Sequence, residues 1–372
     1  MKKTLFISLI IIIAFIFAGC RRQGGLFCPD ECKAADIYEE WVPVWCDEFI
    51  GDTLDFDKWN VLDTAWGGGN NEAQYYHPDN VTVAAGRLII TARHESHGGK
   101  EYTSGRIDTK YKGDWLYGKV VVRAKLPSGR GTWPAIWMLP TMNEYGGWPR
   151  SGEIDIMEYV GYDPDRIHGT IHTEKFNHSR GTQLGSSLTV DDVENKFVEY
   201  GMEWEPGKIT LYVDDKTLAT FAYTPAFNQD VVYYKAWPFD QEFHLIINLA
   251  VGGNWGGARG IDNTIFPTSL EVDYVRVYQK DYQYLDRKKP KAISSIELGS
   301  DLKNFIYWPV PADDQAIAYY EIYLDGKRHD QTNVNSYLFK NLEVGKSYQV
   351  QVVAVDFAGR KAKSVKYSLR FK

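Results

Sequence analysis

The chain has 372 residues, of which 44% are hydrophobic and 24% charged, and its formal net charge is −7. This length exceeds that of one small domain, so we expect two domains and a leader. The composition is that of a globular protein without low-complexity tracts, and the negative charge offers no basic surface for nucleic acid. Its 12 Trp and 25 Tyr residues indicate large β-sheet cores, or flat ring surfaces that suit the apolar faces of sugars.

Residues 1–19 have the features of a secretory signal peptide. Two lysines precede an apolar run from Leu5 to Ala18, which is shorter than the roughly 20 residues that span a bilayer comfortably. The ending Phe-Ala-Gly-Cys20 resembles a bacterial lipobox, in which the cysteine is lipidated and becomes the first residue, although Phe17 stands where Leu is usual. We therefore expect a bacterial lipoprotein anchored through Cys20 in the outer membrane, either at the cell surface or at the periplasmic face. An ordinary signal peptide or an uncleaved anchor is the alternative.

The other cysteines are few. Residues 20–40 are polar and predict a tether. Cys28 and Cys32 are close enough in sequence to close a small disulfide in an oxidising compartment, which would leave Cys46 free. A metal site is less favoured, because no histidine or further cysteine pair lies nearby.

Residues 41–280 carry many strand signals and few helix signals. Alternating apolar and polar residues run in short stretches separated by Gly, Pro, Asn and Asp clusters. These stretches are residues 80–93, 117–127, 166–174, 197–221, 243–253 and 270–280. The first of them turns at Ala85-Gly86. No stretch keeps a helical period of 3.6 residues for three turns, so we expect a large all-β sandwich.

Residues 281–292 are charged, contain proline and lack apolar periodicity, so they predict a linker. Residues 293–372 show a tighter β pattern, with a hairpin signal at Asp325-Gly326. With Trp308 as an early core residue, the approach to Tyr348 resembles the tyrosine corner of a fibronectin type III domain. This resemblance implies a small fibronectin type III-like β-sandwich that is more typical of a spacer or interaction unit than of a catalyst. A glycan-binding module is the alternative.

Three carboxylates, Glu153, Asp155 and Glu158, lie in a stretch that otherwise has the apolar character of a buried strand. Side chains alternate faces along a strand, so the first two share a face and the third should point the other way. A β-bulge at Ile156-Met157 would add one residue and return Glu158 to the face of the others. A metal or salt-bridge cluster and an amphipathic edge strand are alternatives, but they leave the apolar neighbours unexplained.

Two carboxylic acids on one wall are the catalytic groups of glycoside hydrolysis. If Glu153 and Glu158 lean together, their carboxyls can lie about 5–5.5 Å apart, which indicates a retaining, double-displacement mechanism. Asp155 between them adds negative charge, and this favours one ionised and one protonated glutamate.

The stretch from Glu153 to Glu158 resembles the E-x-D-x-x-E signature of glycoside hydrolase family 16 in its bulged form. Further blocks resemble laminarinase-type members and occur in the family order: Trp66–Tyr76, Tyr102–Lys110, Gly131–Pro140, His168–Thr173 and Asn248–Gly257. The resemblance covers residues 41–280 and implies a concanavalin A-like β-jelly-roll sandwich with an open cleft. It also implies that Glu153 is the nucleophile, Glu158 the general acid/base and Asp155 an assisting acid. No cofactor is expected for catalysis.

Candidate substrate-binding residues follow from the same blocks. Trp133 and Trp137 are four apart, so in a strand they share a face and both can line the cleft, unless one is core. Arg106 and Glu72 can hydrogen-bond sugar hydroxyls or form an ion pair with each other. The family places His172 near the acid/base residue, with a purely structural role as the alternative. The loop candidates, which could also pack on themselves, are Asn71, Trp148 and Trp255.

A structural calcium ion is a further implication of the resemblance, on the convex side away from the cleft. The matching ligands are the main-chain oxygens of Glu48 and Gly86 and the carboxylate of Asp273. Oxygen-only coordination suits Ca²⁺. Alternatively, Asp273 forms a salt bridge with Arg276 or another base.

These patterns predict a monomeric, endo-acting β-glucanase that cuts β-1,3 linkages in laminarin-like glucans, or mixed β-1,3/1,4 glucans. A non-catalytic glucan-binding lipoprotein is the alternative from another class, although a pure binder has no need of paired acids. A family member that acts on galactan is a second alternative. Loop lengths decide the linkage preference, so the sequence leaves it open.

Overall fold

The structure is a computed structural model that describes residues 26, 28–35, 38, 40–228, 232–299, 304–340, 342–343 and 345–370. The predicted signal peptide, with Cys20, lies outside the described residues. Among the residues that are described, no helix is long and apolar enough to span a membrane.

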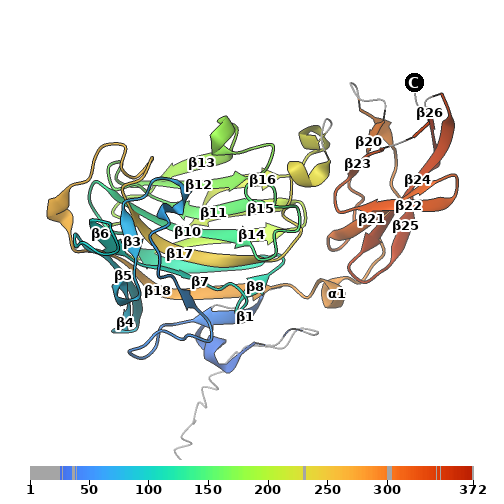
Figure 1. The fold of residues 1–372 in the computed structure, drawn as a ribbon. Helices are drawn as coiled ribbons and strands as arrows, with labels where there is room; N and C mark the ends of the chain where they lie inside the picture. The colour runs from blue at the N-terminus through green and yellow to red at the C-terminus, as the bar shows by residue number, and fades with distance from the viewer. Residues whose placement is uncertain are drawn as a thin grey trace, which may run out of the picture.

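Two eight-stranded antiparallel sheets form the larger part of the molecule and pack face to face (Figure 1). The front sheet contains, in spatial order, β13 (Leu184–Thr189), β12 (Arg166–His172), β11 (Glu153–Glu158), β10 (Thr132–Pro140), β17 (Phe243–Val251), β7 (Arg106–Asp108) and β2 (Asn60–Val61), with β8 (Asp114–Trp115) beside β17. The back sheet contains β16 (Lys216–Ala222), β15 (Lys208–Val213), β14 (Val198–Glu205), β9 (Gly118–Lys125), β18 (Thr268–Gln279), β5 (Arg87–Ala92) and β4 (Val81–Ala84), with β1 (Val42–Asp47) beside β18.

The main core lies between these sheets and follows the period of two in the sequence. In β5, residues 88, 90 and 92 are buried while their neighbours are partly exposed, so one face of the strand meets the front sheet. The predicted turn before β5 is confirmed, since Ala85 and Gly86 both adopt positive φ between β4 and β5. Every residue of β17 is buried. The central strand of the front sheet is thus covered on both faces.

Short elements connect the strands. A parallel pair, β3 (Gln74–Tyr76) and β6 (Tyr102–Ser104), lies beside the front sheet. The short helices are η1 (Asp30–Ala34), η2 (Gly67–Gly69), η3 (Pro78–Asn80), η4 (His178–Arg180), η5 (Pro225–Asn228), η6 (Tyr233–Lys235), η7 (Asn263–Ile265) and α1 (Tyr282–Leu285).

The predicted cysteine pairing is wrong. The disulfide joins Cys32 to Cys46, not Cys28 to Cys32, so Cys46 is not free. It fixes η1 to β1, and the cysteines pack in a small apolar cluster that includes Tyr278 of β18. Part of the segment predicted as a tether therefore lies against the back sheet.

A second, smaller sandwich follows α1 at one end of the first (Figure 1). Its sheets consist of β19 (Glu297–Leu298), β20 (Phe305–Tyr307) and β23 (Ser336–Leu338), and of β22 (Lys327–Thr332), β21 (Ile317–Leu324), β24 (Ser347–Asp356), β25 (Lys361–Lys363) and β26 (Tyr367–Arg370). The Asp325-Gly326 hairpin joins β21 to β22 with positive φ at both residues, and Trp308 is fully buried in the core.

The Tyr348 hydroxyl accepts a hydrogen bond from the backbone N–H of Glu343 at 3.2 Å. This contact has the form expected of a tyrosine corner. The kinship of the module with fibronectin type III domains stays a prediction.

Candidate active site

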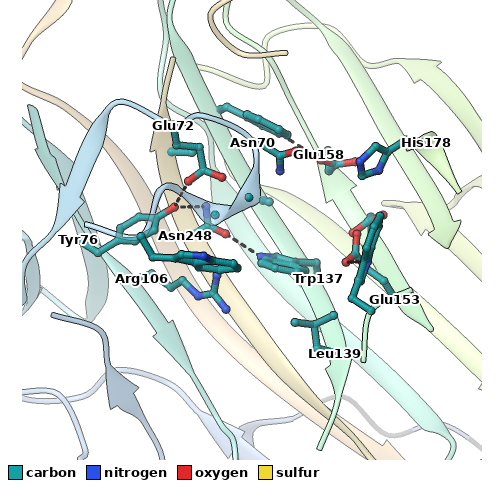
Figure 2. Close-up of a pocket in the computed structure, with 18 of the residues that line it drawn as sticks. Asn70, Glu72, Tyr76, Arg106, Trp137, Leu139, Glu153, Glu158, His178 and Asn248 are labelled. Atoms are coloured by element: carbon teal, nitrogen blue, oxygen red, sulfur yellow. Dashed lines mark hydrogen bonds between the residues drawn. The ribbon is translucent and has the colours of Figure 1, made fainter. Parts of the chain in front are cut away.

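A cavity of about 330 Å³ opens on the outer face of the front sheet (Figure 2). Its walls come from β10, β11, β17 and β7 and from loops. The lining residues are Trp66, Gly68, Gly69, Asn70, Glu72, Tyr76, Arg106, Trp133, Ala135, Trp137, Leu139, Trp148, Glu153, Asp155, Glu158, His178, Ser179, Asn248 and Ala250. A second hollow of about 670 Å³ shares Trp133, Glu153 and Glu158 with the first and continues along β12. The two glutamates therefore stand where the two hollows meet.

The predicted bulge in β11 is confirmed. Asp155 pairs with Thr170 of β12 and Glu158 pairs with His168, so three steps on β11 match two steps on its partner. Ile156 and Met157 are both fully buried in the core. Because two consecutive residues point inward, Glu158 returns to the outer face, and all three acids line the cavity.

Burial raises the pKa of every acid in this cluster, and the charge of Asp155 raises the pKa of the two glutamates further. For Glu158, burial and the nearby charge of Asp155 raise the pKa to about 8. Burial likewise raises the pKa of Asp155 to about 8, against the effect of its hydrogen bond with Glu153. Burial first, and then Asp155, raise the pKa of Glu153 well above its usual range. Since such closely spaced carboxyls cannot all ionise together, the cluster retains protons near neutral pH.

Each of the two glutamates has its own hydrogen-bond donor. The Trp148 Nε1–H donates to Glu153 Oε2 at 2.8 Å, and the Trp133 Nε1–H donates to Glu158 Oε1 at 3.2 Å. Both donors lower the pKa of the glutamate that they contact, against the larger effect of burial. The donors come from different elements, the loop before β11 and strand β10.

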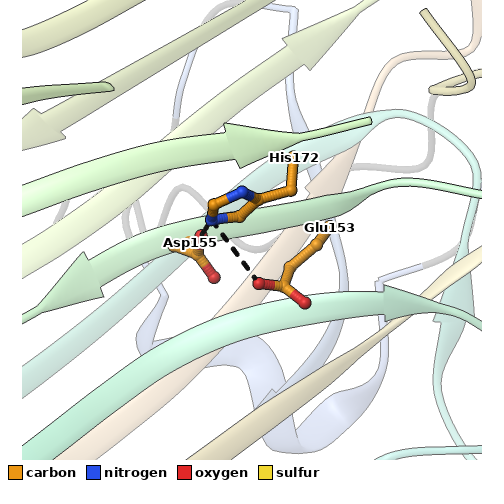
Figure 3. A group of neighbouring side chains, drawn as sticks. All are labelled: Glu153, Asp155 and His172. Carbon is orange, nitrogen blue, oxygen red and sulfur yellow. Dashed lines mark ion pairs between the residues drawn. The ribbon is translucent and has the colours of Figure 1, made fainter. Parts of the chain in front are cut away.

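His172 lies opposite Glu153 in the register of β11 and β12. Its Nε2 is 3.3 Å from Asp155 Oδ2 and 3.8 Å from Glu153 Oε1. Figure 3 shows how the three side chains face one another. The family resemblance placed this histidine near Glu158, but its closest acids are the other two. Ligand atoms of the three side chains lie within 4.8 Å of one another, a spacing that a metal ion could also bridge.

Trp133 and Trp137 both line the cavity, together with Ala135 and Leu139 on the same face of β10. The regular pairing of β10 with β17 preserves this alternation. The Trp137 Nε1–H donates to Asn248 Oδ1 at 2.7 Å, and the Arg106 guanidinium lies 4.9 Å from the Trp137 ring. The ring is thereby held with one face toward the cleft.

The ion pair between Arg106 and Glu72 that the sequence left open does not form among the described residues. Instead, the Tyr76 hydroxyl donates to Glu72 Oε2 at 3.1 Å and accepts from Asn248 Nδ2 at 3.0 Å. Gln74 Nε2 donates to the same oxygen of Glu72 at 2.7 Å. Both charged residues line the cavity, and the Arg106 Nε is buried without a hydrogen-bond partner. A sugar hydroxyl would be a suitable acceptor for an Arg106 N–H.

Of the three candidates in loops, two line the hollows and one does not. Trp148 is exposed on the cavity wall, and Trp255 lines the second hollow, where its ring contacts that of Trp133 at 5.7 Å. Asn71 does not line either hollow, whereas its neighbour Asn70 lines both. The Asn71 side chain instead donates to Asn254 Oδ1 at 2.9 Å and ties two loops together.

Sequence reasoning missed some lining residues. Asn248 is polar in a strand that is otherwise apolar and buried, and this was a usable signal. Tyr76 belongs to the segment Trp66–Tyr76 that resembles laminarinase-type members, but the sequence predicted no role for it. His178 comes from η4, which follows β12 and lies outside the matched blocks, and the fold brings it to the cleft.

The proposed calcium ligands lie outside the cleft. The Asp273 carboxylate contacts the Arg123 guanidinium rather than Arg276. The Glu48 carboxylate accepts from Arg276 at 2.8 Å, and its predicted role was through its main-chain oxygen. Gly86 occupies the turn between β4 and β5. Asp273 is the only residue of the three that was predicted to bind calcium through its carboxylate. A calcium ion at this site would therefore have to displace Arg123 from Asp273.

A second acidic group lies where the linker meets the smaller sandwich. Ligand oxygens of Asp286, Asp313 and Asp356 lie within 4.8 Å of one another. The Arg360 guanidinium donates to Asp286 and to Asp356 and supplies a counter-charge. We interpret the group as an ion-pair network that fastens the linker to the module.

The fold and the site together define a glycoside hydrolase, since paired acids stand in an aromatic-lined cleft on the face of a β-sandwich. The chain matches the model for glycosyl hydrolases family 16 over residues 68–276, and it belongs to that family.

Its relatives include named enzymes. The chain is 46% identical over 285 residues to a β-glucanase from Rhodothermus marinus. The alignment covers 75% of this chain and 95% of that protein. It is 39% identical over 249 residues to a glucan endo-1,3-β-glucosidase from Cryptopygus antarcticus, with coverage of 63% and 91%. The solved laminarinase of Rhodothermus marinus superposes with a TM-score of 0.62 at 50% identity, covering 64% of this chain and 98% of that one.

Replacing Trp133 with Phe should move the basic limb of the profile of kcat/KM against pH to higher pH. The change removes the donor that stabilises ionised Glu158, so the pKa of that carboxyl rises further and its protonated form persists longer. The pH dependence of polysaccharide hydrolysis measures the shift. Trp137→Phe is the matched control, because its indole donates to Asn248 and not to an acid. An equal shift in both variants would contradict the assignment.

Proposed function

We propose that this chain is a retaining endo-β-glucanase that hydrolyses internal β-1,3 linkages, in laminarin-like glucans or in mixed-linkage β-1,3/1,4 glucans. One observation carries the proposal: Glu153 and Glu158 lie where two hollows of an open cleft meet. Such an arrangement lets a polysaccharide lie across the acids with sugar units on both sides. The two relatives, a β-glucanase and a glucan endo-1,3-β-glucosidase, support the same substrate class.

In the first step, Glu153 attacks the anomeric carbon while Glu158 donates its proton to the leaving glycosidic oxygen. The raised pKa of Glu158 keeps that proton available at neutral pH. The Trp148 N–H stabilises the ionised form of Glu153 through its hydrogen bond to Oε2. Asp155 shares a hydrogen bond with Glu153 and can hold the proton that the nucleophile must lose.

In the second step, Glu158 accepts a proton from water, and the water oxygen attacks the anomeric carbon of the glycosyl-enzyme. Glu153 leaves with its electron pair, and the configuration at the anomeric carbon is retained overall. The indole rings of Trp133, Trp137, Trp148 and Trp255 supply flat faces on which sugar rings can stack.

Changing either glutamate to Gln should reduce hydrolysis of laminarin by at least about a thousandfold, because the double displacement needs both carboxyls. The measurement is reducing-sugar release and product size on laminarin, lichenan and barley glucan, with Glu95→Gln as the control for an acid outside the cleft. Near-wild-type turnover in Glu153→Gln or Glu158→Gln would exclude the mechanism. The product pattern of the wild type on the three substrates decides between β-1,3 and mixed-linkage preference.

A calcium ion held by Glu48, Gly86 and Asp273 is also proposed, with a role in stability and none in the reaction. Because the ion must displace Arg123, we expect weak binding, on the order of 10⁻⁴–10⁻³ M as in other extracellular sites. Millimolar CaCl₂ should raise the Tm of the chelator-treated wild type, and Asp273→Asn should abolish that calcium-dependent rise. An unchanged Tm in the wild type would remove the calcium site.

The lipid anchor is proposed on the lipobox resemblance alone, with the enzyme held at the bacterial outer membrane. Expressed with its leader in a Gram-negative host, the wild type should fractionate with membranes and carry a lipid on Cys20. Cys20→Ser should move the protein to the soluble fraction without changing its activity. Mass spectrometry of the mature N-terminus decides, and an unmodified Cys20 would contradict the anchor.

A further inference from the structure

The smaller sandwich makes specific contacts with the catalytic domain. Val334, in the turn between β22 and β23, is buried in the main core of the larger sandwich. Next to it, Asn333 Nδ2 donates to Asp240 Oδ2 at 2.8 Å. A further hydrogen bond joins the hydroxyls of Tyr223 and Ser336 at 2.6 Å. The module thus packs against the catalytic domain and is not joined to it by the linker alone.

Asp240 collects hydrogen bonds from three directions. Besides Asn333, the Tyr233 hydroxyl donates to Oδ2 and the Tyr145 hydroxyl donates to Oδ1, both at 2.8 Å. Burial raises the pKa of Asp240, and these donors act against that rise, the first of them being Asn333. A buried carboxylate that loses one of its donors becomes costly to keep in place.

Tyr145 belongs to the segment of residues 142–151, here called the Trp148 loop. Its ring stacks on that of Tyr234 with centroids 4.5 Å apart. Its backbone N–H donates to Ser151 Oγ, and Ser151 Oγ donates to the carbonyl of Gly146, so the loop is closed on itself.

Gln241, next to Asp240, binds both arms of the Trp148 loop. It accepts from the Glu144 N–H at 3.0 Å and donates to the Ser151 carbonyl at 3.1 Å. The segment that Asn333 contacts is therefore the base on which the loop rests.

The tip of the loop contacts the proposed nucleophile, since the Trp148 Nε1–H donates to Glu153 Oε2 at 2.8 Å. A displacement of Tyr145 or Asp240 would move the indole nitrogen relative to that carboxylate. A hydrogen bond to a charged oxygen is sensitive to such small changes in distance and angle.

We propose that Asn333 of the smaller sandwich is a positioning residue for hydrolysis, which acts through Asp240 and Tyr145 to hold the Trp148 indole against Glu153. The inference rests on the proposed role of Glu153 as nucleophile. The solved laminarinase of Rhodothermus marinus aligns over 98% of its length with 64% of this chain. That share of this chain is too short to contain both sandwiches, so almost the whole of that enzyme is matched without the complete smaller sandwich. The module therefore tunes an active site whose machinery lies in the larger sandwich, and the expected effect is moderate.

The test compares Asn333→Ala with Tyr223→Phe in the full-length chain. Each variant removes one hydrogen bond between the two sandwiches, but only the first leads to the Trp148 loop. Asn333→Ala should lower kcat/KM on laminarin by about 3- to 10-fold, the effect of one lost hydrogen bond. It should also move the acidic limb of the profile of kcat/KM against pH to higher pH, because ionised Glu153 loses part of its stabilisation. Tyr223→Phe should leave that limb in place.

A double-variant cycle separates positioning from general destabilisation. In a Trp148→Phe background, which lacks the indole N–H, Asn333→Ala should cause no further shift of the acidic limb. A shift that persists in this background would overturn the proposal, as would an activity loss that is uniform at every pH. Thermal unfolding of all four proteins shows whether they are folded at the assay temperature. If Glu153 were not the nucleophile, Glu153→Gln would remain active, an outcome distinct from failure of the Asn333 cycle.

Discussion

The active site depends on one extra residue in β11. A regular strand would send Glu158 into the core between the sheets, where an unpaired carboxylate would be very costly. The bulge instead buries Ile156 and Met157 in succession, and the apolar core that receives them fixes the register. The same bulge therefore sets the packing of Ile156 and Met157 in the core and the direction of Glu158 on the opposite face of the front sheet. A slip of one residue would lose both.

Placing three acids on one desolvated wall creates a problem that the surrounding residues solve. Their environments differ, because Trp148 donates to Glu153, Trp133 donates to Glu158, and His172 lies nearest Asp155. Identical carboxyls thereby acquire different proton affinities, which is the condition for one to act as nucleophile and another as acid. The assignment of roles follows from the family resemblance. The structure gives each acid a different set of neighbours, and the raised pKa of Glu158 fits the role of the acid.

The alternation of side chains along a strand made much of the site's geometry predictable from the sequence. The parity of Glu153 and Glu158 required a bulge, and the spacing of Trp133 and Trp137 placed both on one face of a strand. Contacts between distant segments were not accessible in this way. The short spacing of Cys28 and Cys32 suggested a disulfide, yet η1 lies beside β1 and brings Cys46 to Cys32 instead.

In loops, where no period applies, the choice between neighbouring residues failed. Asn70 lines the cleft, whereas Asn71 was predicted to do so. His178 carried no signal, because it lies in the short helix η4 after β12, outside the matched blocks. The predictions were most secure on the regular strands of the front sheet, although the loop residues Trp148 and Trp255 also line the cleft as expected.

The charged segment of residues 281–292 has the composition of a flexible linker, and composition alone favours two independent bodies. Side-chain contacts favour a different view. Burying Val334 in the main core contributes about 1.5 kcal/mol or more by the usual value for a valine side chain. The same turn supplies a donor to the buried Asp240. Removal of the module would expose part of that core and leave the carboxylate short of a partner, so the second sandwich stabilises this end of the catalytic domain. Its influence on the cleft then follows from ordinary packing, with no conformational switch required.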